Sequence, residues 1–113
     1  MNNEILEKYN IHFYKNVRGE ERTDGRSVLS TYVGSWETKG DIDDLLTDVD
    51  RCLNGQYDSV EDIYYDHSLI GIYAEITPDY LILSDEHRLN PIKIPMVDFR
   101  EILLSWREFF LSS

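Results

Sequence analysis

The residue types that could do chemistry are concentrated in "YDSVEDIYYDHS", residues 57 to 68, which we call the acidic stretch. Three tyrosines and four carboxylates share its twelve positions, without a lysine or an arginine. Such a composition is compatible with three kinds of structure: a solvated connection, an acidic site for a metal ion, or a surface that meets a basic partner. The charge, the motifs and the predicted elements of the whole chain distinguish between these three structures.

Negative charge also extends upstream of the acidic stretch. The 113 residues include 22 acids and 11 bases, a net charge of −11, and nine of the acids lie between Asp41 and Asp66 with Arg51 as the single base. A concentrated negative field repels nucleic acid and anionic membrane surfaces and attracts basic proteins. We therefore expect a basic protein partner, with no nucleic acid and no membrane. The alternative is that the acids only keep the protein in solution.

The sequence lacks the usual signatures of catalysis and of metal binding. Its one cysteine, Cys52, falls on an apolar helical stripe, where a thiol behaves as a small buried hydrophobe. No serine stands in a glycine-flanked elbow, and no glycine-rich phosphate loop is present. His12, His67 and His87 are not spaced to bring ligands onto one surface. We expect neither an enzyme nor a metal or other cofactor, although a pair of carboxylates for acid and base chemistry stays open.

Acids and tyrosines of two neighbouring segments form the candidate binding surface. Asp44 and Asp48 are an i, i+4 pair on one flank of an expected helix, and Asp43 and Asp50 are an i, i+7 pair on the other. Like charges at such spacings cost a few tenths of a kcal/mol per pair, so something other than helix stability is expected to keep them. Tyrosine is enriched at the centres of protein interfaces, although here it could instead pack onto a sheet beneath a solvated loop. The candidate partner-binding residues are Asp44, Asp48, Asp58, Glu61, Asp62, Tyr64, Tyr65 and Asp66.

Hydrophobic periodicity predicts the elements that position these residues in the first half of the chain. Alternation predicts strands over 9–17 and 27–36, joined by an exposed connection at 18–26. The second strand is apolar on both sides, so we expect it inside the sheet. An apolar stripe with helical spacing predicts a helix over 40–55, which Asp41 can cap.

The second half of the chain continues the same pattern. It is predicted to contain a strand at 68–76, a turn at 77–80, a strand at 81–84, a polar loop at 85–91, a strand at 92–94 and a helix at 96–111. Trp106 lies on the buried stripe of that helix. The order β-β-α-β-β-β-α predicts a single α+β domain over 1–113, with an antiparallel sheet of about five strands and two helices on one face.

The expected location of the protein is the cytoplasm. The N-terminal "MNNEILEKYN" has no basic region followed by an apolar core, so it is not a signal peptide. No apolar run approaches the roughly 20 residues that are needed to span a bilayer. A lone thiol such as Cys52 stays reduced in the cytosol.

The C-terminal sequence "IPMVDFREILLSWREFFLSS" combines a short strand, a proline-led turn and a tryptophan-containing helix. In this feature, in size and in charge, the chain resembles the small immunity proteins of bacterial polymorphic and contact-dependent growth-inhibition toxin systems. The likeness covers roughly the last third of the chain. It implies a non-catalytic inhibitor that binds its cognate toxin, often a basic nuclease, and blocks the active site or the substrate surface. No binding residue is transferred by motif.

Two hypotheses about function follow. The first is an immunity-type inhibitor, whose carboxylates pair with the basic side chains that a nuclease uses to hold phosphate while its tyrosines supply contact area. The alternative is a generic interaction or regulatory module, self-associating through a sheet edge or through Leu104 and Leu111 on the last helix.

Overall fold

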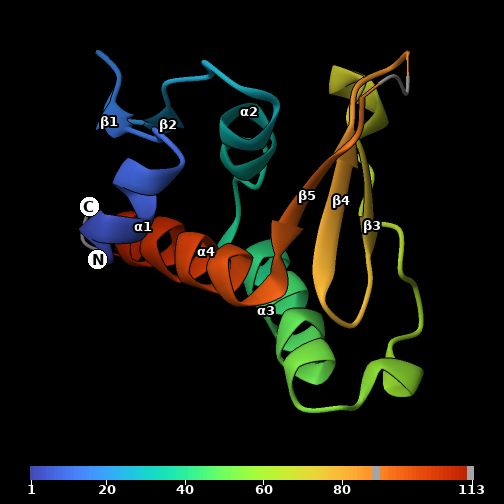
Figure 1. Ribbon diagram of the computed structural model, residues 1–113. Coiled ribbons are helices and arrows are strands. Elements are labelled where there is room, and N and C mark those ends of the chain that lie inside the picture. The colour runs from blue at the N-terminus through green and yellow to red at the C-terminus, as the bar shows by residue number, and fades with distance from the viewer. Residues whose placement is uncertain (88–89, 112–113) are drawn as a thin grey trace.

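The computed structural model describes residues 1–87 and 90–111 (Figure 1). Its elements are α1 (Asn3–Lys8), β1 (Phe13–Lys15), β2 (Glu21–Thr23), α2 (Val28–Gly34), α3 (Lys39–Leu53), 3-10 turns at Tyr57–Ser59 and Ser68–Ile70, β3 (Tyr73–Ile76), β4 (Tyr80–Ser84), β5 (Ile92–Pro95) and α4 (Met96–Leu111). The fold class is α+β, as predicted. In the described residues, however, the strands form two small antiparallel sheets, β1-β2 and β3-β4-β5, and not one sheet of five.

The two long helices confirm the predictions made from apolar spacing. Helix α4 has the predicted bounds, and α3 begins one residue earlier than predicted and ends two residues earlier. The N-cap of α3 is Thr38, whose hydroxyl oxygen accepts a hydrogen bond from the backbone N–H of Asp41 at 3.2 Å, so the expected cap at Asp41 is wrong. The two helices pack against each other beneath the three-stranded sheet (Figure 1).

The strand predicted over 27–36 is wrong, because this segment forms α2. The hydroxyl oxygen of Ser27 accepts a hydrogen bond from the backbone N–H of Ser30 at 3.0 Å and caps the helix. Tyr32 and Val33 are fully buried on its inner side. A cap and tertiary burial thus outweigh the strand preference of the β-branched and aromatic residues, since propensity is only a weak prior.

The N-terminal segment also differs from the prediction. The strand expected over 9–17 shortens to β1, and the connection expected at 18–26 contains β2, its pairing partner. Helix α1 was not predicted. It is capped by Asn2 and fastened to α4 by an ion pair between Lys8 and Asp98, whose Nζ and Oδ2 atoms are 2.9 Å apart.

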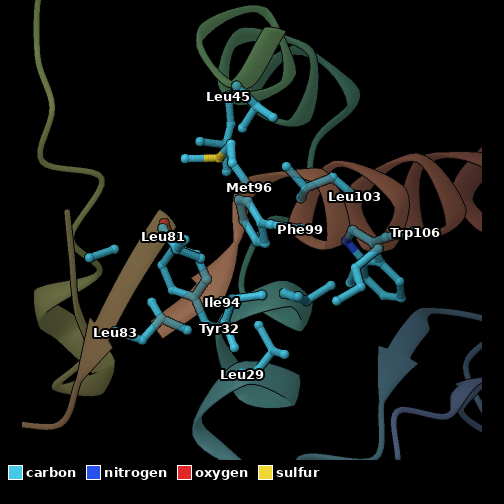
Figure 2. Close-up of a cluster of buried hydrophobic side chains, with 14 of the residues drawn as sticks. Leu29, Tyr32, Leu45, Leu81, Leu83, Ile94, Met96, Phe99, Leu103 and Trp106 are labelled. Atoms are coloured by element: carbon cyan, nitrogen blue, oxygen red, sulfur yellow. The ribbon is translucent and has the colours of Figure 1, made fainter. Parts of the chain in front are cut away.

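The hydrophobic core lies between the three-stranded sheet and the helices. Inward side chains of the sheet, among them Leu81, Leu83 and Ile94, lie on the side of Phe99 of α4 and Tyr32 of α2 (Figure 2). Trp106 lies further along α4, where its ring contacts that of Phe13 in β1. Strands β3, β4 and β5 confirm the strands predicted at 68–76, 81–84 and 92–94 with small changes in their bounds. The first is shorter than predicted, because residues 68–70 form a 3-10 turn. This sheet has one face in the core and leaves the other uncovered by the described helices.

Burial of Cys52 gives a direct test of the α3 packing. Its side chain lies in the core, and burial followed by the nearby charge of Asp48 raises the pKa of the thiol. Because the thiolate is the reactive form, a maleimide reagent is expected to label the native protein far more slowly than the protein in denaturant. Equally rapid, stoichiometric labelling in both conditions would show that α3 does not present this face to the core.

Candidate functional site

The acidic stretch is not a free connection, because residues 63–67 run antiparallel along the edge of β3. The backbone N–H of Tyr65 donates to the carbonyl oxygen of Ala74 at 3.0 Å, and that of His67 donates to the carbonyl oxygen of Ile72 at 2.8 Å. These pairings add an irregular fourth strand to the three-stranded sheet. The segment therefore has a fixed position and a fixed pleat.

Asp66 holds this edge in place with its side chain. In a regular ladder the N–H of Ala74 would donate to the carbonyl of Tyr65. Instead it donates to Oδ1 of Asp66 at 2.7 Å, and the carbonyl oxygen of Tyr65 accepts from the hydroxyl of Tyr32 at 2.7 Å. The side chain of Asp66 remains exposed, so it can combine this structural role with contact to a partner.

The neighbouring tyrosines of this strand point in opposite directions, because successive side chains of a strand alternate between its faces. Tyr64 is 58 % exposed, whereas Tyr65 packs against the core. The hydroxyl of Tyr65 donates to Oδ2 of Asp48, and Arg51 donates to Oδ1 of the same carboxylate at 2.7 Å. Asp48 is only 7 % exposed, so this candidate partner-binding residue is buried. Asp48 and Tyr65 join α3 to the edge strand formed by residues 63–67.

The hydroxyl of Tyr65 lies in a negative environment that acids of α3 and Asp62 create. Burial raises the pKa of Tyr65, and so do the hydrogen bond to Asp48 and the negative charges of Asp48, Asp44 and Asp62. Both Asp44 and Asp62 are exposed. Acids that lie 18 positions apart in the sequence thus act on the same hydroxyl group.

The other flank of α3 has a structural explanation. Asp50 Oδ1 accepts from Arg100 Nε at 2.6 Å, and Asp43 Oδ1 accepts from Arg107 Nε at 2.5 Å. Asp43 also pairs with Lys39, and these bonds hold its pKa below the usual value, with the Arg107 bond as the largest cause. This pair of acids therefore has a structural role outside its own helix, since both residues fasten α3 to α4.

After these pairings, six of the nine acids between Asp41 and Asp66 remain exposed and form no ion pair with another residue in the described part of the chain. Two of the six accept a backbone N–H, namely Asp62 from Tyr64 and Asp66 from Ala74, but an N–H group does not neutralise a charge. We call five of these acids the acidic edge: Asp44, Asp58, Glu61, Asp62 and Asp66.

The uncovered side of the sheet is a second part of the site. In the register of the sheet, Glu75 lies opposite Tyr64 on one side and Ile82 on the other, and Ile82 lies opposite Lys93. We call this side the outer sheet face: Tyr64, Asp66, Tyr73, Glu75, Tyr80, Ile82, Ser84 and Lys93. It carries a hollow of about 360 Å³ lined by residues such as Tyr64, Glu75 and Ile82. Glu75 and Tyr80 were not among the candidate residues, although they alternate with the aliphatic residues that β3 and β4 bury, a pattern the sequence already contains.

Among residues 1–87 and 90–111, no group of three or more His, Cys, Asp or Glu side chains is placed to hold a metal ion. None of the helices in those ranges has the length and apolar character to cross a membrane. Comparison with protein-family models, curated proteins and solved structures found no match.

The different roles of the two tyrosines can be tested by removing each hydroxyl. We expect Tyr65→Phe to lower the free energy of unfolding by about 1–3 kcal/mol, because the buried carboxylate of Asp48 loses a hydrogen-bond donor. Tyr64→Phe is the matched control and should change stability by less than about 0.5 kcal/mol, as is usual for an exposed position. Urea unfolding followed by circular dichroism measures both. Equal effects of the two substitutions would contradict the assigned orientations.

Proposed function

We propose that the protein is a non-catalytic inhibitor that binds a basic protein toxin through the acidic edge and the outer sheet face, as an immunity protein does. One observation carries this proposal. Four exposed acids without an ion-pair partner in the described chain lie in the segment that leads into and forms the sheet edge, the same segment that carries the exposed Tyr64: Asp58, Glu61, Asp62 and Asp66. Unpaired charges on a fixed scaffold favour a partner that supplies the opposite charge.

The proposed mechanism is occlusion of the surface with which the toxin holds its substrate. A nuclease binds phosphate with lysine and arginine side chains, and carboxylates such as Asp58 and Glu61 can pair with those cations. Both are exposed, and neither makes a hydrogen bond within the described residues. Tyr64 supplies a large rigid side chain of the type that dominates binding energy at interface centres.

Self-association through the last helix has less support. Leu104 packs partly against the core, whereas Leu111 is exposed, so the two do not form a continuous exposed strip. This hypothesis predicts a dimer that forms without any other protein. Sedimentation of the purified chain over a range of concentrations separates it from the proposed function.

The proposed function is tested by identifying the partner and then measuring its toxicity with and without this chain. The tagged protein is purified from its native cell at low salt, and the bound protein is recovered and expressed alone. We expect a net basic protein that is released at high salt, that inhibits growth when expressed alone, and that is harmless when this chain is co-expressed. A partner that is acidic, that stays bound regardless of salt, or whose toxicity is unaffected by this chain would contradict the proposal.

A further inference from the structure

The hollow on the outer sheet face is built around two side chains that face each other across neighbouring strands. Tyr64 and Glu75 are directly opposite in the sheet register, a relation that places their Cβ atoms about 4.5–5.5 Å apart. Ile82 lies on the other side of Glu75 and lines the hollow with an aliphatic side chain. An aromatic ring, a carboxylate and an aliphatic side chain thus stand in one row.

The carboxylate in this row has no nearby cation within the described chain. Glu75 is half-buried, and its side chain makes no hydrogen bond or ion pair with another residue of 1–87 or 90–111. Lys93 lies two strands further along the same row, which is about 9.5 Å at the usual strand spacing. Its Nζ atom lies 5.8 Å from the centroid of the Tyr80 ring. Glu75 and the neighbouring Asp66 therefore leave this end of the face negative.

The contact between Lys93 and Tyr80 is also a precedent for cation binding on the outer sheet face. It shows that a cation over a tyrosine ring already forms on this face of the sheet. Tyr64 offers a similar ring at the opposite, acidic end, where it is more exposed than Tyr80. A cation that binds there has both the ring and a carboxylate to contact, because Glu75 stands beside Tyr64.

Arginine is the side chain that matches this combination. Its planar guanidinium can stack on an aromatic ring while it donates two hydrogen bonds to a carboxylate, and it loses hydration more easily than the ammonium of lysine. We propose that the hollow receives an arginine side chain of the basic partner, which stacks on Tyr64 and pairs with Glu75. This inference rests on the proposed function for the basic character of the partner and adds the kind of residue that is recognised.

The test uses a defined probe and does not need the partner. The full chain, labelled with ¹⁵N, is titrated at low salt with the amide of acetylated tetra-arginine and, separately, of tetra-lysine. We expect saturable shifts centred on Tyr64, Glu75 and Ile82, and tighter binding of the arginine peptide. Glu75→Gln should raise the dissociation constant of the arginine peptide by about fivefold to tenfold, since the substitution removes a charge-assisted contact. Glu7→Gln, an exposed acid of α1, is the matched control and should have little effect.

Two outcomes would overturn the inference. One is a set of shifts spread over the acidic edge, with the same affinity in the wild type and in Glu75→Gln. The other is equal affinity for the two peptides. Either result leaves the proposed function standing, because that function requires only a basic toxin that binds the acids. Failure of the proposed function would appear instead in the purification and co-expression experiment.

Discussion

Replacement of Trp106 with alanine is expected to lower the free energy of unfolding by about 3–5 kcal/mol. Its side chain is completely buried, its indole N–H donates to the carbonyl oxygen of Trp36 at 2.9 Å, and its ring centroid lies 4.9 Å from that of Phe13 and 5.0 Å from that of Phe110. Small domains are stable by only about 5–15 kcal/mol. The variant should therefore be partly or wholly unfolded at a temperature where the wild type is native.

The control for this prediction is an exposed apolar residue of the same helix. Leu111→Ala removes a side chain that is 54 % exposed, so its effect should stay near 0.5 kcal/mol. Thermal and urea unfolding of the three proteins measures the difference. An unchanged melting temperature for Trp106→Ala would show that α4 does not pack against Phe13 and Trp36 as described.

The long helices were predictable because their signal is local and repeated. In α3 the buried residues Ile42, Leu45 and Val49 recur at helical spacing over 15 residues, and α4 shows the same pattern over 16. The seven residues of α2 contain too few turns for such a repeat, and β-branched residues among them mimic a strand. Its helical state depends on a cap at Ser27 and on burial of Tyr32 against other elements.

The candidate site was predicted only in part, because ion pairs depend on tertiary neighbours. The sequence indicated where the acids are concentrated, but the partners of Asp43 and Asp50 lie on α4, about sixty positions away in one case and fifty in the other. The burial of Asp48 follows from its bond to Tyr65, which exists only because residues 63–67 pair with β3. The pairs of Asp43 with Lys39 and of Asp48 with Arg51 have the local spacings i, i+4 and i, i+3, but no local pattern shows the bonds to α4 and to the edge strand.

Reversal of two charges on the acidic edge is the second prediction with a large expected effect. Asp58→Lys combined with Glu61→Lys should leave stability nearly unchanged, because exposed charges contribute little to it. Association with the basic partner should slow by about tenfold or more, since charges at the rim of an interface act mainly on the association rate. The dissociation rate should change less.

The matched control is Glu4→Lys combined with Glu7→Lys. Both residues are exposed on α1, outside the acidic edge. Each pair of reversals removes two negative charges and adds two positive ones, so both variants change the net charge from −11 to −7. A difference between them therefore reports the position of the charges and not their sum.

The most direct measurement is the association rate constant of wild type, edge variant and control with the recovered partner, by stopped-flow fluorescence over a range of salt concentrations. The proposed surface predicts a rate for the wild type and the control that falls steeply as salt rises. It predicts a slower rate with a much shallower salt dependence for Asp58→Lys with Glu61→Lys. Equal rates and equal salt dependence in all three proteins would contradict binding through the acidic edge.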